Sequence, residues 1–181
     1  MASRPQIYLD SCCFIDYVKQ EVGALPTDRE RDAWFIKQLL LAHRSGLIVV
    51  NTSLVAVGEC LSIEKGQAIV PEEAKDLFRR LMTSGQYVRL INPTPKTPRL
   101  MQDFRWNHGL VLGAIDSMHL AAAVETKCSE FITTDDRLRK PKVAAAIPAM
   151  ALLGLRMICA NQTSQLSSAT TQNELQQEDE R

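Results

Sequence analysis

Four acidic side chains lie in the sequence where a metal-dependent site would need them. Asp10 directly follows the apolar run at residues 7–9, and Asp135 follows a second apolar run in the segment FITTDD. Glu59 and Asp116 lie inside the apolar segments VAVGECL and GAIDSMHLAAA. An ionised carboxylate in apolar surroundings is unfavourable unless a cation or hydrogen bonds compensate it. No Lys or Arg stands next to Asp10, Glu59 or Asp116 in the sequence.

If the fold brings these four carboxylates together, their mutual repulsion requires a cation. Hard oxygen ligands of this kind select Mg²⁺ or Mn²⁺. One or two such ions beside a phosphate ester support hydrolysis by a metal-activated water. The acids therefore predict a Mg²⁺ (or Mn²⁺) cofactor and hydrolysis of phosphodiester bonds.

Each of these acids also has a purely structural interpretation. Asp10 and Asp135 could cap helices, and we expect Asp136 to do so, which leaves Asp135 facing the site. Asp116 could be a first-turn acid that the helix dipole favours. Glu59 could pair with a distant Arg. Each signal is weak by itself, and it is the order of the four that is specific.

The elements that must position these acids alternate between strands and helices. Apolar runs predict strands at residues 7–9, 47–50, 87–91, 131–133 and 155–159. Apolar periodicity and stop signals predict helices at residues 11–18, 28–43, 54–65, 71–85, 100–107 and 114–127. Ser11 is the expected N-cap of the first helix. This alternation indicates an α/β domain with a mostly parallel sheet, in which sites lie at the carboxyl ends of strands.

Four sequence blocks together resemble the PIN domain, particularly the VapC-like toxins of type II toxin–antitoxin pairs. The blocks are IYLDSCCFIDYV, TSLVAVGECL, GAIDSMHLAAA and FITTDDRL, and the resemblance covers about residues 6–160. It implies a three-layer α/β/α fold with a five-stranded, mostly parallel sheet in the order 3-2-1-4-5. It also implies that Asp10, Glu59, Asp116 and Asp135 are the catalytic and metal-binding residues.

The same resemblance implies a function and partners. Such proteins are typically Mg²⁺-dependent endoribonucleases that cleave RNA, often form homodimers, and are inhibited by a cognate antitoxin. Two alternatives stay open: a PIN-type RNA-processing nuclease without an antitoxin, and an RNA-binding PIN module that does not cleave.

Several residues near the acids could support the site. Ser11, Thr133 and Thr134 could orient the acids or a water, although ordinary capping is the alternative. Arg137 heads a basic cluster that could hold RNA phosphates or simply form a solvated face; its other members are Arg139, Lys140 and Lys142. Trp106 could stack on a base, but we favour a core or dimer contact. We expect His119 to be structural, because no second His or HExxH spacing accompanies it.

Composition limits the class of protein further. The 181 residues include 21 basic and 21 acidic side chains, and this zero net charge argues against a protein that coats nucleic acid nonspecifically. We expect residues 1–160 to form the nuclease-like domain and residues 161–181 to form a disordered polar tail. The tail has a net charge of −3, from Glu174, Glu178, Asp179 and Glu180 against Arg181, which leaves +3 on residues 1–160.

The cysteines and the apolar runs predict where the protein works. The five cysteines are odd in number and show no CxxC spacing, which favours reduced, mostly buried thiols in a cytoplasmic protein. The start MASRPQIYLD lacks the apolar region of a signal peptide. No uncharged apolar run is long enough to predict a membrane span.

Overall fold

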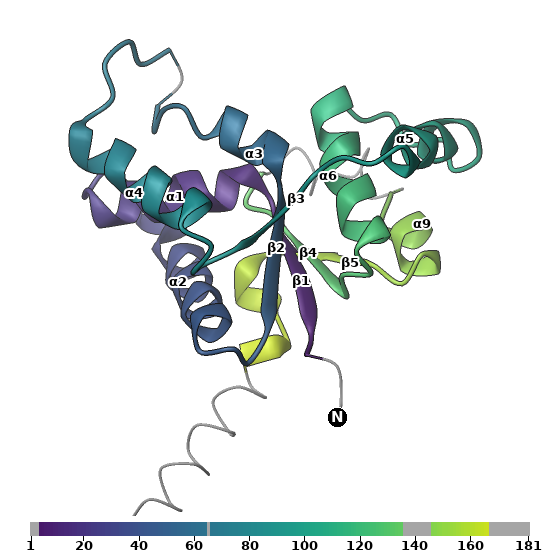
Figure 1. The fold of residues 1–181 in the computed structure, drawn as a ribbon, viewed down its shortest axis with the longest axis horizontal. Helices are drawn as coiled ribbons and strands as arrows, with labels where there is room; N and C mark the ends of the chain where they lie inside the picture. Colours follow the sequence, from purple (N-terminus) through teal and green to yellow (C-terminus); the bar gives the residue numbers. More distant parts are fainter. Residues whose placement is uncertain (1–3, 65, 136–145, 167–181) are drawn as a thin grey trace, which may run out of the picture.

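A single parallel sheet organises the computed structural model, which describes residues 4–64, 66–135 and 146–166 (Figure 1). Its five strands lie in the order β3-β2-β1-β4-β5, and every neighbouring pair is parallel. The strands are β1 (Gln6–Leu9), β2 (Val49–Ser53), β3 (Arg89–Ile91), β4 (Glu130–Ile132) and β5 (Arg156–Ile158). The predicted α/β class and strand order are therefore confirmed.

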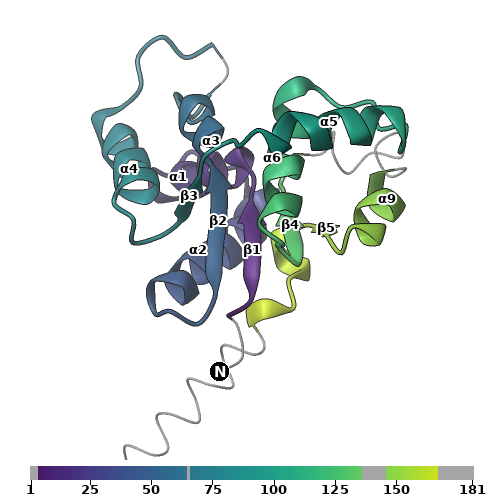
Figure 2. The same ribbon diagram turned by 45° about the vertical axis from the view of Figure 1, so that its right-hand side comes forward.

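Helices cover both faces of the sheet, which gives three layers (Figures 1 and 2). One face carries α1 (Ser11–Glu21), α2 (Glu30–Arg44) and α4 (Glu72–Thr83), and the other carries α5 (Lys96–Trp106), α6 (Ala114–Glu125) and α9 (Ala146–Leu152). Strand β1 is buried on both sides, because Ile7 and Leu9 pack into the first layer and Tyr8 into the second. None of the described helices is long and apolar enough to cross a membrane.

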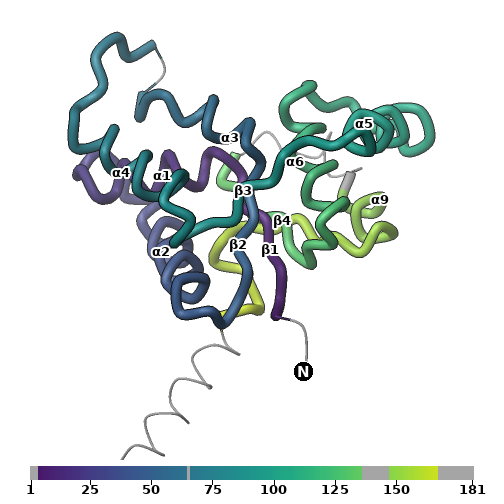
Figure 3. The backbone as a smooth tube through the Cα atoms, in the orientation of Figure 1, coloured from purple at the N-terminus to yellow at the C-terminus, as the bar shows by residue number. Residues whose placement is uncertain are grey.

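The sheet has a topological switch point between β1 and β4. From β1 the chain builds outward through β2 and β3, whereas β4 and β5 extend the other edge, as the trace in Figure 3 shows. Where β1 ends, the Asp10 N–H donates to the Ile132 carbonyl at 3.0 Å. The residues that follow β1 and β4 are therefore neighbours, at the position where open α/β sheets place their sites.

Strand β2 lies further along the chain than its apolar run predicted. We expected a strand at residues 47–50, but β2 extends through Asn51 and Thr52, whose side chains are fully buried. Both side chains bond to the neighbouring strand: the Asn51 amide donates to the Ile7 carbonyl at 3.1 Å and the Thr52 hydroxyl to the Leu9 carbonyl at 2.9 Å. These long-range hydrogen bonds offset the cost of burying the two polar side chains. A prediction of strands from apolar runs cannot include such residues.

The helix after β2 is shorter than predicted. We expected residues 54–65, but α3 runs only from Leu54 to Glu59, with Ser53 as its N-cap. Gly58 weakens the last turn, because glycine loses more backbone freedom in a helix than other residues. Glu59 is therefore the last residue of a six-residue helix.

The described structure continues past residue 160, where we expected the domain to end. A 3₁₀ turn, η2 (Ala160–Gln162), follows β5, and Leu166 packs against the core of the first layer. The Thr163 and Ser164 side chains hydrogen-bond to Glu130, which is buried in β4. The expected boundary therefore falls inside a described segment, and residues 167–181 lie outside the described residues.

Candidate active site

Asp10 caps the first helix and is also aimed at the switch point. It is the N-cap of α1, a position that we expected for Ser11, and its Oδ1 accepts from the Ser11 N–H at 2.8 Å. Its Oδ2 accepts from the Thr133 hydroxyl at 2.9 Å and from the Cys12 thiol at 3.3 Å. The side chain is almost fully buried, yet all three donors are neutral. The hydrogen bonds fix the carboxylate without neutralising its charge.

The turn after β4 folds onto the turn after β1. The Thr133 hydroxyl, which donates to Asp10, accepts from the Asp135 N–H at 3.1 Å. The Thr134 N–H donates to the Cys12 sulfur at 3.2 Å. Thr133 therefore hydrogen-bonds to both Asp10 and the Asp135 backbone, and its orienting role stays a prediction.

Glu59 reaches the same edge through a histidine. Its Oε2 lies 2.6 Å from Nε2 of His119, and that nitrogen lies 3.9 Å from Oδ1 of Asp10. His119 is only 1 % exposed, so the contact is shielded from water on the histidine side. The structure thus joins acids from β1 and α3 through a residue of α6.

His119 lies among the predicted acids, a position that the sequence analysis did not anticipate. We assigned it to the fold alone, but it contacts two of the four predicted acids. The available signal was its spacing: His119 lies three residues after Asp116, and residues at this spacing share one face of a helix.

The electrostatics couple His119 to the acids around it. The hydrogen bond from His119, helped by one from Ser11, lowers the pKa of Glu59, although burial opposes the shift. For His119 burial acts to lower the pKa, but the Glu59 hydrogen bond and the charges of Asp10, Glu59 and Asp116 outweigh it and raise the pKa. Both shifts favour the charged forms, an ionised Glu59 and a protonated His119.

Asp116 lies back over the start of its own helix. A Cβ built on Gly113, the N-cap of α6, would stand 3.3 Å from Oδ2 of Asp116. Glycine at this position therefore leaves room for the carboxylate. The charge of Asp116 is among the causes that raise the pKa of His119, as are the charges of Asp10 and Glu59. Asp116 therefore lies in the same region as these two acids.

The predicted four-carboxylate cluster is only partly assembled. Asp10 and Glu59 meet at His119, the charge of Asp116 acts on the same histidine, and the Asp135 N–H donates to Thr133. Within residues 4–64, 66–135 and 146–166, no group of three or more His, Cys, Asp or Glu side chains is already arranged to hold a metal ion. The four-acid metal site therefore stays a prediction.

The donor chemistry of this pair nevertheless fits a hard cation. Asp10 and Glu59 offer carboxylate oxygens, and in the described part of the chain neither forms an ion pair with Lys or Arg. If Mg²⁺ or Mn²⁺ binds, these two residues, together with Asp116 and Asp135, are the ones that would hold it.

Two predictions about supporting residues have different outcomes. Trp106, at the end of α5, is 72 % exposed, so the expected core role is wrong, while base stacking and a dimer contact stay predictions. Arg137 and its basic neighbours, like Asp136, lie outside the described residues.

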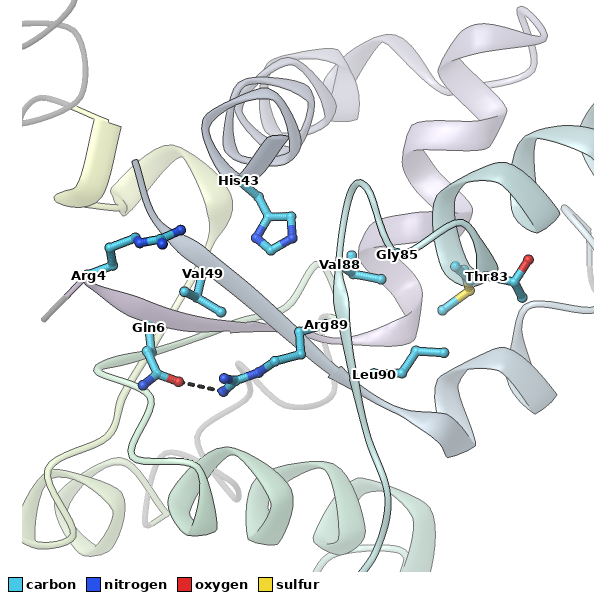
Figure 4. A pocket seen from close by; sticks show the side chains of 10 residues that line it. Arg4, Gln6, His43, Val49, Thr83, Gly85, Val88, Arg89 and Leu90 are labelled. Atoms are coloured by element: carbon cyan, nitrogen blue, oxygen red, sulfur yellow. Dashed lines mark hydrogen bonds between the residues drawn. The ribbon is translucent and has the colours of Figure 1, made fainter. Parts of the chain in front are cut away.

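A well-formed pocket lies at the opposite end of the sheet. Its cavity of about 660 Å³ is lined at the starts of β1 and β2 by Arg4, Gln6 and Val49, with His43 of α2 above them (Figure 4). The Arg89 guanidinium is turned towards Gln6, to which it donates at 2.7 Å. None of the predicted acids lines this pocket, so the chemistry that they support belongs to the carboxyl ends of the strands.

Comparison with known proteins agrees with this architecture. The family model described as "PIN domain" matches residues 7–144. No curated protein matches the chain.

Solved structures with a similar fold come from proteins of low sequence identity. VapBC2 from Rickettsia felis, bound to a DNA fragment from its promoter, has a TM-score of 0.54 at 13% identity, covering 85% of this chain and 98% of that one. FitAB bound to an IR36 DNA fragment has a TM-score of 0.53 at 15% identity, with coverages of 87% and 97%. FitAcB from Neisseria gonorrhoeae has a TM-score of 0.50 at 16% identity, with coverages of 87% and 99%. These likenesses concern the fold, and the family match spans most of the sequence: the chain belongs to the PIN domain family.

Proposed function

We propose that this protein is a metal-dependent endoribonuclease that hydrolyses RNA phosphodiester bonds. One observation carries the proposal: Asp10 and Glu59, from separate elements, lie within 4 Å of the same His119 nitrogen at the switch point of the sheet. Asp10 is a buried carboxylate whose hydrogen bonds come from neutral donors and which has no Lys or Arg partner in the described chain, a setting typical of sites that take a cation. The family match supports a nuclease, and the acids support hydrolysis of a phosphate ester.

The side chains of the protein would act mainly by holding oxygen atoms in place. Ser11 and Thr133 fix both oxygens of Asp10, so this carboxylate does not have to be ordered when a substrate arrives. Asp116 and Asp135 would complete the cation site from the flanks. A bound Mg²⁺ or Mn²⁺ would supply an activated water and would neutralise charge on the phosphate.

We further propose that the protein is the toxin of a toxin–antitoxin pair and that it works as a homodimer. The four sequence blocks that resemble VapC-like toxins support this, as does the likeness of the fold to VapBC2 and FitAB. A cognate antitoxin would then bind this chain and inhibit cleavage. Co-expression with the protein encoded by a neighbouring small reading frame tests this part, and growth arrest that no such protein relieves would contradict it.

Cleavage of structured RNA by the purified protein tests the nuclease itself. We expect cleavage with Mg²⁺ or Mn²⁺, none with excess EDTA, and a loss of about 100-fold or more for Asp10→Asn, because a ligand to the cation is lost. Asp103→Asn is a matched control, since Asp103 also faces a histidine, His108 at 3.5 Å, but lies outside the site. Cleavage that persists in EDTA or in Asp10→Asn would contradict the proposal, and RNA binding without cleavage would favour the non-cleaving module.

A further inference from the structure

A buried column of side chains ends at the Glu59 carboxylate. Phe131 of β4 stacks on Tyr8 of β1 with ring centroids 5.3 Å apart and planes 7° apart. The Tyr8 hydroxyl lies 2.7 Å from Nδ1 of His119, whose Nε2 contacts Glu59 at 2.6 Å. Phe131, Tyr8 and His119 are all buried. The column therefore runs from strands β4 and β1 through His119 of α6 to Glu59, whose carboxylate is its solvent-facing end.

The Tyr8 hydroxyl is suited to hold the imidazole ring. It accepts from the Ser53 N–H at 2.8 Å, which leaves it one proton to donate and one lone pair. A hydroxyl in this state satisfies Nδ1 as donor or as acceptor. The ring is thus held whichever of its nitrogens carries hydrogen.

Besides His119, Glu59 has a hydrogen bond from Ser11 with a smaller effect on its pKa, and its helix adds little restraint. It is the last residue of the six-residue α3, it follows Gly58, and its side chain is 34 % exposed. A free glutamate side chain has several rotamers, and fixing one of them costs conformational entropy. The 2.6 Å contact with His119 selects the rotamer that places Glu59 beside Asp10.

We propose that His119 and Tyr8 are positioning residues, which hold Glu59 beside Asp10 before any cation arrives. This inference rests on the proposed function, in which Glu59 and Asp10 share a cation. Ser53 belongs to the same device, because it both caps α3 and bonds to Tyr8. One short chain of hydrogen bonds therefore links the helix that carries Glu59 to the strand that leads to Asp10.

Three variants separate positioning from general stabilisation. His119→Leu removes the donor to Glu59, His119→Gln keeps an N–H near the position of Nε2, and Tyr8→Phe removes only the hydroxyl and retains the ring on Phe131. Matched controls are His43→Gln, because His43 accepts from the Val50 N–H at the other end of the sheet, and Tyr17→Phe. If His119→Leu does not fold, the other two variants still decide the matter.

Two measurements are needed, and the first uses no metal. In crystal structures of the metal-free proteins, we expect the Glu59 carboxylate beside Asp10 in the wild type and in His119→Gln. In Tyr8→Phe and His119→Leu we expect it to be turned away or in several conformers. The second measurement is the Mn²⁺ dissociation constant, from the paramagnetic signal of free Mn²⁺. We expect binding about 10–100-fold weaker for His119→Leu, as when an outer partner of a metal ligand is lost.

Different outcomes test the positioning role and the nuclease activity. His119→Gln should restore most of the Mn²⁺ affinity that His119→Leu loses, and the two controls should shift melting alone. Glu59 unmoved in Tyr8→Phe and His119→Leu, or no gain in affinity from Leu to Gln, would overturn the positioning role. A wild-type protein that binds Mn²⁺ but leaves RNA intact would contradict the nuclease and not the positioning role.

Discussion

Two buried carboxylates on neighbouring strands of one sheet have opposite surroundings. Glu130, at the start of β4, is 2 % exposed and lies 2.8 Å from an Arg156 guanidinium nitrogen. It also accepts from the Thr163 hydroxyl at 2.6 Å and from the N–H and hydroxyl of Ser164 at 3.1 and 2.8 Å. Asp10, at the end of β1, has neutral donors, and its nearest basic group in the described chain is His119 at 3.9 Å. Burial alone does not mark a site, and a buried carboxylate whose hydrogen bonds all come from neutral donors is the better candidate for one.

The largest expected effect comes from removing the charge of Glu130, which has Arg156 as its partner. Glu130→Gln should lower stability by about 2 kcal/mol, because charge-assisted hydrogen bonds are lost in a buried setting. Asp10→Asn should stay within about 1 kcal/mol of the wild type, because Asn is an equally good N-cap and its amide can donate to Thr133. Thermal unfolding of the metal-free proteins measures both. Equal losses in the two variants would remove the distinction between these carboxylates.

Truncation sharpens the same comparison. Composition alone predicted that residues 161–181 form a disordered tail, but Thr163 and Ser164 supply donors to Glu130. A chain that ends at residue 161 should therefore be less stable by about 1–2 kcal/mol than one that ends at residue 166. Identical melting curves for the two chains would show that these hydrogen bonds add nothing to stability.

Asp116→Asn tests how strongly the carboxylates around His119 repel one another. Removing one of several like charges should leave the metal-free protein as stable as the wild type or up to about 1 kcal/mol more stable. The gain is limited, because Asp116 also favours the charged form of His119. A marked loss of stability in urea unfolding would instead identify Asp116 as a structural cap of α6.

A smaller effect is expected from pH. The pKa of His119 is raised, so its charged form stabilises the fold fully below its ordinary value near 6.5, and this stability is lost as pH rises through the raised pKa. The pKa of Glu59 is lowered, so its contribution is present above about 4.5 and is lost as pH falls through the lowered pKa. The metal-free wild type should lose about 1 kcal/mol or less on the alkaline side, since Glu59 is partly exposed. His119→Gln should flatten this alkaline limb, and an unchanged limb would assign it to other groups.

The sequence was sufficient to predict the order of elements but not the polar contacts between them. Short apolar runs located β1 and β4, and the alternation with helices indicated a parallel sheet. Strand β2 was misplaced because Asn51 and Thr52 become acceptable in a core only through bonds to Ile7 and Leu9, far away in the sequence.

The site shows the same limit. Local pattern predicted Asp10 and Asp135, because Asp10 directly follows β1 and Asp135 lies three residues after the end of β4. It did not predict the bridge between Asp10 and Glu59, since His119 contacts residues far from it in the chain. The surroundings of Glu130 were not predicted either, because its partners Thr163 and Ser164 lie in a segment whose composition suggested disorder.

We propose that the carboxyl ends of β1 and β4 carry a cation site. Melting curves with and without Mn²⁺, for the wild type and for Asp10→Asn, test it most directly. A ligand at 100 times its dissociation constant stabilises the folded state by about 2.7 kcal/mol, which in a protein of this size raises the melting temperature by several degrees. The account predicts that rise in the wild type and little or none in Asp10→Asn, although both proteins melt alike without metal. An equal Mn²⁺ shift in both proteins, or none in the wild type, would contradict it.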